Sequence, residues 1–347
     1  MEKKKMSVGK KILIALLIII LIVIIISSII AIIGYNYVNS KIEKIQQVEI
    51  PVEDLEVSEK VEEKYKEKYR NIAIFGVDSR GSNLGKGNRS DCIIIASINN
   101  ETKEVRLVSV YRDTYLQIEK YGLDKVNHAY SYGEAPLAIK TLNTNLDLNI
   151  KEFVTVNFDA VVEAVDALGG IEMDITSAET KYINSYINEV SRVTGKSSKN
   201  ITQAGHYTLD GIQAVAYSRI RYTEGGDYKR TERMRDVIEA MVKKLKTKSI
   251  AEIDNILDIV LPKVYTNIPA NEILSIIPTM LSYNVSDSIG WPYSTRGITL
   301  DRWYGVPITL ETNVMQLHID LFEEEEYVPS DFVPEVSDKI VRKTGYQ

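Results

Sequence analysis

Two aspartates in this chain are placed where they could act together on one ligand. Asp78 follows the apolar run NIAIFGV, and Asp91 opens the next one, DCIIIASINN. If the two runs are antiparallel neighbours in a sheet, both carboxylates lie at the same edge of it. Close carboxylates repel and share a proton or a cation, and oxygen ligands favour a hard ion such as Mg²⁺ or Mn²⁺. The alternative is that each aspartate pairs with a local arginine, Arg80 or Arg89.

Five arginines are candidates for binding an anion, because a guanidinium binds phosphate oxygens in pairs and keeps its charge at any working pH. A diphosphate with Mg²⁺ would match such a ring of charges. The candidates are Arg89, Arg112, Arg219, Arg221 and Arg230. Arg219 and Arg221 would point to different faces of a helix, but to one side of an extended segment. Taken singly, each arginine also fits a surface ion pair. Of the later Arg233 and Arg235, inside a helix, at least one is expected to be structural.

Composition and motif spacing exclude several other kinds of protein. The 347-residue chain carries a net charge of −6 and no recognisable nucleic-acid module, so a nucleic-acid partner is not expected. Its single cysteine, Cys92, excludes an internal disulfide and is interpreted as a small buried hydrophobe. The three histidines lack the spacing of a zinc site, and the loop GSNLGKGN lacks the pattern of a phosphate-binding P-loop.

The elements that must position these residues alternate between strands and helices. Strands are predicted at 71–78, 91–100, 104–113, 153–158 and 171–175, and helices at 134–146, 159–170, the start of 208–222, and 229–248. Residues 250–283 are expected to be helical and 284–315 to return to strands. This alternation predicts an α/β fold, a three-layer α/β/α domain with a central mixed sheet. Reactive groups are expected at the carboxyl ends of its strands.

The first forty residues indicate a membrane anchor. Residues 12–34 contain no charge, and a helix rising ~1.5 Å per residue would span the ~30 Å core of a bilayer. Five lysines precede it, which predicts a cytoplasmic N-terminus and an extracytoplasmic remainder. A cleaved signal peptide would need a shorter apolar core and a cleavage site, and neither is evident. The expected parts are a cytoplasmic tail (1–11), a transmembrane helix (12–34), a charged stalk (35–69), a folded extracytoplasmic domain (70–315) and an acidic, solvated C-terminal tail (316–347).

An ordered set of signatures resembles the LytR-CpsA-Psr family of bacterial cell-wall glycopolymer transferases. Over about residues 70–250 they are FGVDSR followed by GNRSD, then SVYRDTYL, KVNHAYSYGE, VDALGGIEMDI and LDGIQAVAYSRIRYTEGGDYKR. One such motif would be weak, but the set in this order is specific. An N-terminal anchor with an extracytoplasmic domain also fits the family.

The resemblance implies a membrane-anchored phosphotransferase in which residues 70–315 form the catalytic domain. It would move an anionic glycopolymer from a polyprenyl-diphosphate lipid, held in a long hydrophobic tunnel, onto peptidoglycan as a phosphodiester. Its partners would be the lipid-linked glycopolymer, peptidoglycan and the cell membrane. The residues matching the family's metal ligands are Asp78 and Asp91, for Mg²⁺ or Mn²⁺. The matching catalytic residues are Asp78, Asp91, Arg112, Arg219 and Arg221, and the diphosphate-binding arginines are Arg89, Arg112, Arg219, Arg221 and Arg230.

Two positions depart from the family pattern, and several questions stay open. Met234 stands where the family commonly has glutamine, and it cannot donate an amide hydrogen bond. The usual glycine pair after the tyrosine motif is Gly133-Glu134 here. The polymer, whether teichoic acid or capsule, and the general base are not settled. The alternatives are a polyprenyl-diphosphate phosphatase that uses water as acceptor, and a non-catalytic regulator that binds envelope lipids.

Overall fold

The computed structural model describes residues 37, 39–41, 43–79, 84, 85, 87–276, 279 and 282–347. The chain divides into two compact units, Met1–Lys44 and Ile45–Gln347. The expected cytoplasmic tail (1–11) and transmembrane helix (12–34), and Arg80, lie outside the described residues. In the part of the chain that is described, no helix is long and apolar enough to cross a membrane.

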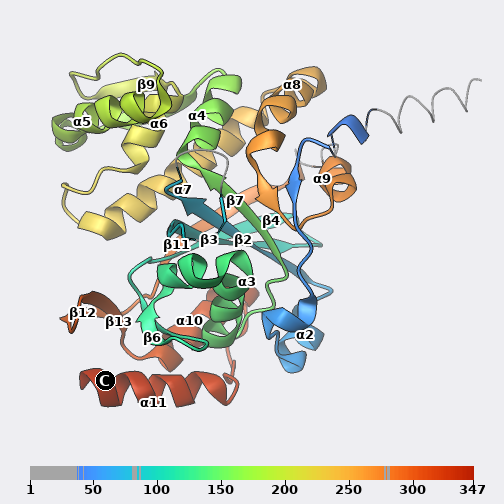
Figure 1. Cartoon of the computed structure of the whole chain (residues 1–347), viewed down its shortest axis with the longest axis vertical. Coiled ribbons are helices and arrows are strands. Elements are labelled where there is room, and N and C mark those ends of the chain that lie inside the picture. Colours follow the sequence, from blue (N-terminus) through green and yellow to red (C-terminus); the bar gives the residue numbers. More distant parts are fainter. Residues whose placement is uncertain are drawn as a thin grey trace, which may run out of the picture. The chain divides into compact units, whose positions relative to one another are not determined.

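A seven-stranded mixed sheet forms the centre of the unit Ile45–Gln347 (Figure 1). Its strand order is β1-β10-β7-β2-β3-β4-β11, in which β1 with β10, β7 with β2, and β4 with β11 are parallel pairs. The strands are β1 (Gln46–Gln47), β10 (Tyr265–Thr266), β7 (Glu152–Asn157), β2 (Tyr69–Val77), β3 (Ser90–Asn99), β4 (Glu104–Val110) and β11 (Asn284–Trp291). The predicted α/β fold with a central mixed sheet is confirmed.

Helices cover both faces of the sheet (Figure 1). One face carries α3 (Val126–Leu146), α10 (Leu310–Phe322) and α11 (Phe332–Thr344), and the other carries α4 (Phe158–Ala167), α6 (Gly211–Ser218), α7 (Gly226–Leu245) and α8 (Ile250–Val260). The remaining helices are η1 (Val52–Leu55), α2 (Glu59–Tyr65), α5 (Ser177–Thr194), η2 (Leu261–Lys263) and α9 (Ala270–Ile276). Three two-stranded antiparallel sheets lie outside the central sheet: β5 (Tyr115–Ile118) with β6 (Gly122–Lys125), β8 (Ile171–Ile175) with β9 (Gly205–Leu209), and β12 (Thr295–Thr299) with β13 (Trp303–Pro307).

The two faces of β2 meet different surroundings. Because side chains alternate along a strand, Phe75 and Val77 point to one face and Ile74 to the other. Phe75 and Val77 are fully buried in a core that includes residues of α3, α10 and α11. Ile74 and Gly76 are only partly buried, because they line an apolar cavity on the opposite face. One side of the sheet is therefore closed, while the other keeps open space.

Two expectations about the ends of the domain are wrong. Residues 45–69 are not a free stalk: β1 pairs with β10, and Leu55, Val61 and Tyr65 are buried in the core. Residues 316–347 are not a solvated tail either, because they complete α10 and form α11. Leu317 and Val336 in these helices are fully buried. The acidic run at residues 323–326 lies in the connection between α10 and α11, and the apolar faces of these two helices close the core.

Two further expectations hold only in part. Residues 250–283 were expected to be helical throughout, but β10 interrupts them between α8 and α9 and joins the sheet. Residues 284–315 contain the expected strands β11, β12 and β13, and then turn helical where α10 begins at Leu310. A two-residue strand is too short to leave a periodic pattern, which is why β10 cannot be read from the sequence.

Candidate active site

Asp91 lies at an irregularity in the pairing of β2 with β3. Gly76 pairs with Cys92 and Val77 pairs with Ser90, so Asp91 has no partner opposite it. Such a bulge re-aims a side chain, and bulges are common beside active sites. Asp78 directly follows Val77, so both aspartates lie at the same edge of the sheet, as their positions in the sequence predict.

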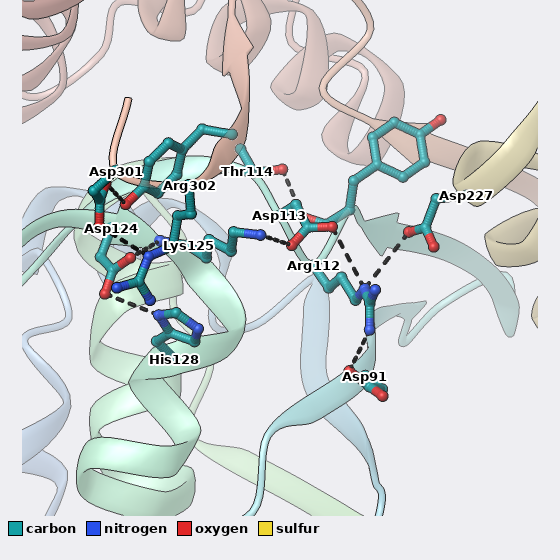
Figure 2. Close-up of polar contacts among 12 residues, drawn as sticks. Asp91, Arg112, Asp113, Thr114, Asp124, Lys125, His128, Asp227, Asp301 and Arg302 are labelled. Atoms are coloured by element: carbon teal, nitrogen blue, oxygen red, sulfur yellow. Dashed lines mark hydrogen bonds and ion pairs between the residues drawn. The ribbon is translucent and has the colours of Figure 1, made fainter. Parts of the chain in front are cut away.

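Arg112 lies in the turn that follows β4 and reaches back to this edge (Figure 2). Its Nη1 donates a hydrogen bond to Oδ1 of Asp91 at 2.7 Å. Its Nε lies 3.5 Å from Oδ2 of Asp113 and 3.8 Å from Oδ2 of Asp227. Burial alone would lower the pKa of Arg112, but the carboxylates of Asp91, Asp227 and Asp113 together raise it.

Asp227, in the first turn of α7, joins three guanidinium groups. Nη2 of Arg230 donates to its Oδ2 at 2.9 Å, Nε of Arg221 lies 3.6 Å from its Oδ1, and Arg112 is the third neighbour. Nη2 of Arg230 also donates to the main-chain oxygen of Asp91, at 3.4 Å. Asp227 thus connects the start of α7 to the edge of the sheet. We call Asp91, Arg112, Arg221, Asp227 and Arg230 the arginine cluster.

Arg230 is the most deeply buried member of the arginine cluster, at 2% exposed. Burial lowers its pKa, and the nearby Arg112 and Arg221 add to that effect. Its Nε has no hydrogen-bond partner among the described residues. Burying a guanidinium costs free energy when some of its N–H groups have no acceptor. An incoming anion would supply the missing acceptor, so Arg230 is well suited to bind one.

A second carboxylate–cation pair extends the site on the other side of Arg112. Nζ of Lys125 lies 2.7 Å from Oδ1 of Asp113 (Figure 2). Beside it, Oδ1 of Asp124 accepts a hydrogen bond from the backbone N–H of Lys125 at 2.8 Å, and its Oδ2 lies 2.9 Å from Nδ1 of His128. Lys125 ends β6 and is the N-cap of α3, so this pair ties the polar edge to the helix below the sheet.

The other predicted site residues lie outside the arginine cluster. Asp78 and Arg89 are exposed, and neither makes a hydrogen bond or ion pair with another described residue. Arg219 ends α6 in a helical conformation, donates to Glu189 at 2.9 Å and stacks over Phe158 at 4.9 Å. Arg219 and Arg221 therefore do not converge on one partner here. The alternative in which Asp91 pairs with its neighbour Arg89 is not met, because the partner of Asp91 is Arg112. A pairing that involves Arg80 lies outside the described residues.

The two later arginines of α7, Arg233 and Arg235, are both buried. Arg233 is a structural residue, as expected for at least one of the two: it is 1% exposed, and its guanidinium bonds to Glu179 at 2.8 Å, to the Ile220 carbonyl at 3.1 Å and to Thr223 at 2.8 Å. These bonds fix the segment that precedes α7. Arg235 is also buried, and burial lowers its pKa.

An apolar cavity of about 300 Å³ lies between the sheet and the helices α4, α6, α7 and α8. The wall includes Ile74, Val154, Val156, Ala164, Val215, Val237 and Met241. Met234, at the position where glutamine is usual in the family, is one of the lining residues and extends the apolar wall. Cys92 lines it too, and burial raises the pKa of its thiol to about 12, which fits its interpretation as a hydrophobe rather than a nucleophile.

One face of α7 connects the arginine cluster to this cavity. Asp227, Arg230, Met234, Val237 and Met241 follow one another at intervals of three or four residues, so they share a face of the helix. The first two belong to the arginine cluster, and the last three line the cavity. The helix therefore presents a charged end and an apolar run in line, which matches an amphiphile with an anionic head.

Sequence reasoning missed Asp113 and Asp227 as site residues. Asp227 has a signal in the sequence, because it follows two glycines and precedes a helical pattern, a position typical of a first helical turn. Gly225 and Gly226 both have positive φ, 87° and 52°, which lets the chain reverse before α7. Asp113 follows Arg112 directly, and nothing in its spacing separates it from an ordinary turn residue.

The carboxylates at the sheet edge suit a hard cation only when a bound ligand supplies further oxygen atoms. Among the described residues, no group of three or more histidine, cysteine, aspartate or glutamate side chains could hold a metal ion. Mg²⁺ is commonly held by one or two carboxylates, water and substrate phosphates. Asp78 and Asp91, at one edge and beside the arginine cluster, fit that kind of shared site.

Comparison with known proteins identifies the family. Residues 31–290 match the model of the LytR_cpsA_psr family. The chain belongs to this family. It is 34% identical over 208 residues to the polyisoprenyl-teichoic acid–peptidoglycan teichoic acid transferase TagU of Enterococcus faecalis, a match that covers 59% of this chain and 63% of that protein. The match to the TagU of Oceanobacillus iheyensis is 31% identical over 252 residues and covers 70% of this chain and 73% of that one.

The fold is also that of solved structures. One of them, described as the LytR-CPS2A-psr family protein YwtF (TagT) with bound octaprenyl pyrophosphate lipid, aligns with a TM-score of 0.51 at 22% identity. It covers 80% of this chain and 91% of its own. The matched part of this chain spans less than two thirds of the Enterococcus faecalis relative, and residues after 290 lie beyond the family match.

Proposed function

We propose that this chain is a phosphotransferase that moves an anionic glycopolymer from a polyprenyl-diphosphate carrier onto peptidoglycan. The observation that carries the proposal is the single face of α7, which runs from the arginine cluster into the apolar cavity. A polyprenyl diphosphate has the same order of parts, an anionic head joined to an apolar chain. The relatives named as teichoic acid transferases support the same class of donor and acceptor.

The donor would bind with its prenyl chain in the cavity and its diphosphate at the arginine cluster. Burying the chain against Val237 and Met241 would supply affinity roughly in proportion to the apolar area covered. Arg112, Arg221 and Arg230 would bind the diphosphate oxygens, and these would replace part of the carboxylate contacts that the guanidiniums make now. We also include the exposed Arg89, and Arg219, which is now bonded to Glu189, as residues that the diphosphate could recruit.

Mg²⁺, or Mn²⁺, would be held by Asp78 and Asp91 together with the diphosphate. When bound, the ion would neutralise negative charge on the phosphate oxygens. Asp91 already has one oxygen bonded to Arg112, which leaves the other for a cation. The carboxylate of Asp91 would then contact a guanidinium through one oxygen and the metal ion through the other, next to the position proposed for the diphosphate.

The reaction would be a displacement at the phosphorus that carries the glycopolymer. A hydroxyl of peptidoglycan forms a new P–O bond, the bond to the oxygen of the polyprenyl phosphate breaks, and the proton of the hydroxyl passes to the departing polyprenyl phosphate or to water. Negative charge grows on the departing polyprenyl phosphate, and fixed cations lower the barrier by neutralising it. Arg112 and Arg230 can do this without moving, because surrounding carboxylates and the bulged edge already hold them.

The N-terminal anchor belongs to the same proposal. A transmembrane helix over residues 12–34, with the remainder outside the cell membrane, would keep the domain beside a lipid-linked donor. Cysteine-scanning of residues 8–40 with a membrane-impermeant thiol reagent tests it. Labelling only on the C-terminal side of residue 34 in intact cells is expected, and labelling of residues before 12 would contradict it.

Transfer assays on single-residue variants test the function. The full chain is incubated with a labelled lipid-diphosphate glycopolymer, with and without peptidoglycan fragments. Arg112→Ala and Arg219→Ala should abolish transfer while circular dichroism and thermal unfolding remain those of a folded domain. Normal transfer by both variants would exclude the proposal. Release of polyprenyl phosphate at the same rate without acceptor would identify a phosphatase, and metal-independent binding without turnover would identify a binding protein.

A further inference from the structure

A second pocket lies on the opposite side of the arginine cluster from the apolar cavity. Its volume is about 240 Å³, and three segments line it: the turn after β4, the start of α7, and the β12–β13 hairpin. From these come Asp113, Asp227, Tyr228, Thr295 and Trp303. The two pockets share no lining residue. Because the hairpin follows residue 290, this wall lies beyond the family match.

Trp303 forms a flat apolar wall of the second pocket. In the hairpin, Gly297 pairs with Gly305 across the two strands, so neither position carries a side chain. The indole occupies the space above them: a Cβ added at Gly297 would lie 2.8 Å from its Nε1, and one at Gly305 would lie 3.7 Å from its ring. Because the two glycines have no side chains, the ring of Trp303 packs directly against the backbone of the hairpin. The residue remains 43% exposed.

Tyrosines and carboxylates complete the second pocket. Tyr228 is 40% exposed, and its ring packs edge-to-face against Tyr111 at 4.5 Å between ring centres, which fixes its position. Asp113 and Asp227 lie on either side of Arg112 (Figure 2). Their oxygens can accept hydrogen bonds from hydroxyl groups. The pocket therefore combines an exposed aromatic face with acceptors beside the charged centre.

We propose that the second pocket binds a sugar ring, which stacks its C–H face on Trp303 and donates hydroxyl hydrogens to Asp113 and Asp227. This inference rests on the proposed function and names the saccharide subsite of the same active site. A prenyl chain fits poorly here, because it would take two carboxylates and their cationic partners out of water without offering them a hydrogen bond. A second anionic group fits poorly as well, because it would face those carboxylates directly. An aromatic wall with hydroxyl acceptors matches the two kinds of surface that a pyranose presents.

The order of groups along α7 agrees with this assignment. From the cavity, the face of α7 passes Met234 and Arg230 and reaches Asp227 and Tyr228 at the second pocket. A lipid with its tail in the cavity and its diphosphate at Arg230 would direct its first sugar this way. The acceptor hydroxyl must approach the same phosphorus from the side opposite the leaving group, so its ring could occupy the same space. The shared chemistry is a sugar ring, and the experiment separates the two sources.

Tryptophan fluorescence of the full chain in nanodiscs tests binding without catalysis. The chain has two tryptophans, of which Trp291 is fully buried, so a soluble quencher such as acrylamide reports mainly on Trp303. Two probes are titrated: the disaccharide of N-acetylglucosamine and N-acetylmuramic acid, and geranyl-diphospho-N-acetylglucosamine. Saturable protection of Trp303 by the disaccharide identifies an acceptor subsite, and protection by the geranyl compound alone identifies a donor subsite. Unchanged quenching with both probes overturns the proposal.

Calorimetry on variants supplies the matched control. Trp303→Ala should weaken binding of the protecting probe about 10-fold, and Trp303→Phe should weaken it less because it keeps an aromatic face. The control is Tyr121→Ala, which removes an exposed aromatic ring of the β5–β6 hairpin that is 52% exposed and lies outside the second pocket. It should leave affinity unchanged. Equal affinity in Trp303→Ala and the wild type would overturn the proposal.

The same variants separate this proposal from the proposed function. In the transfer assay, Trp303→Ala should raise the KM of one substrate about 10-fold and change kcat little. If Arg112→Ala abolishes transfer but Trp303→Ala changes neither KM nor saccharide affinity, the transferase assignment stands and the subsite is wrong. If saccharides protect Trp303 in a chain that transfers nothing to any acceptor, the subsite stands and the transferase assignment is wrong.

Discussion

Nη1 of Arg112 lies 2.7 Å from Oδ1 of Asp91, although the two residues come from different strand ends. The bulge in β3 turns Asp91 toward the turn after β4, and the turn brings Arg112 back to the edge of the sheet. A proposed metal ligand and a proposed phosphate-binding residue are therefore bonded to each other. This pairing keeps both side chains in place before a substrate arrives, which limits the reorganisation needed in the reaction.

Replacing Asp91 by asparagine tests this pairing. Asp91→Asn keeps the shape and one oxygen that can accept from Arg112, so the domain should remain folded. It removes the negative charge, so transfer should fall by about 10²-fold or more, and the Mg²⁺ concentration for half-maximal rate should rise. Steady-state transfer assays across a Mg²⁺ titration measure both effects. An unchanged metal dependence would exclude Asp91 as a ligand.

The strand edge and every member of the arginine cluster except Asp227 could be predicted from the sequence, whereas Asp227 and the contacts that join the cluster could not. The apolar run that ends at Val77 and the one that begins after Asp91 identify two adjacent strands. The polar residues at the ends of these runs locate the site. The contacts of Asp227 depend on how α7 packs against a turn far away in the chain. No local sequence pattern predicts that packing. The bulge at Asp91 cannot be predicted from the sequence either, because one unpaired residue leaves the apolar run intact.

The C-terminal helices show a signal that composition hides. In α11 the buried Val333, Val336 and Ile340 follow a helical spacing, and in α10 Leu317 and Leu321 are four apart. The stretch FEEEEYVPSD between them dominates the local charge and favours an exposed tail. Periodicity is the better guide here, because a helix needs only one apolar face to be buried.

Filling the apolar cavity tests its proposed occupant. Ala164 lines the cavity from α4, and Ala164→Phe would place a ring in space that the folded chain leaves open. Stability should be unchanged or slightly higher, because the ring is buried in an existing void. Binding of a polyprenyl diphosphate to the full chain, followed by native mass spectrometry, should be lost. The control Val162→Ile adds bulk on the same helix at a buried site away from the cavity lining and should keep lipid binding.

Glu134 occupies a backbone conformation that favours glycine. Its φ is 57° and its ψ is −155°, and it interrupts the helical geometry of α3 together with Gly133. This is also the position where the family usually has the second glycine of a pair. Non-glycine residues in this region are strained by about 1–3 kcal/mol. Glu134→Gly should therefore be more stable than Glu134→Ala by at least about 1 kcal/mol in urea unfolding, and equal stability would contradict the strain.

The buried pair Arg233–Glu179 is expected to be structural rather than catalytic. Both side chains are almost fully buried, and their nearest atoms are 2.8 Å apart. Arg233→Met removes one partner and leaves a buried carboxylate, which should destabilise the fold by about 3–5 kcal/mol. Chemical denaturation measures the loss. At a temperature where the variant stays folded, its kcat should be within a few-fold of the wild type, and a selective loss of kcat would assign Arg233 to the site instead.

His318 should make the stability of the domain depend on pH. It is fully buried in α10, where its Nδ1 lies 3.1 Å from the Tyr65 hydroxyl and its Nε2 lies 3.0 Å from the Leu146 carbonyl. The tautomer with hydrogen on Nε2 satisfies both contacts while neutral. Burial lowers the pKa of His318 to about 3, from 6.5. Below pH 6.5 the unfolded chain takes up a proton that the folded protein resists.

Because the unfolded state binds more protons, stability should fall as pH drops from 6.5 towards 3. The lowered pKa corresponds to roughly 5 kcal/mol at the acid end, before other groups are counted. His318→Gln carries no such group, so its own stability should depend less steeply on pH between 6.5 and 4. The variant should be less stable than the wild type at pH 7, and the gap should narrow on acidification. If the unfolding free energies of the two proteins depend equally on pH across this range, the imidazole does not stay neutral in the folded protein.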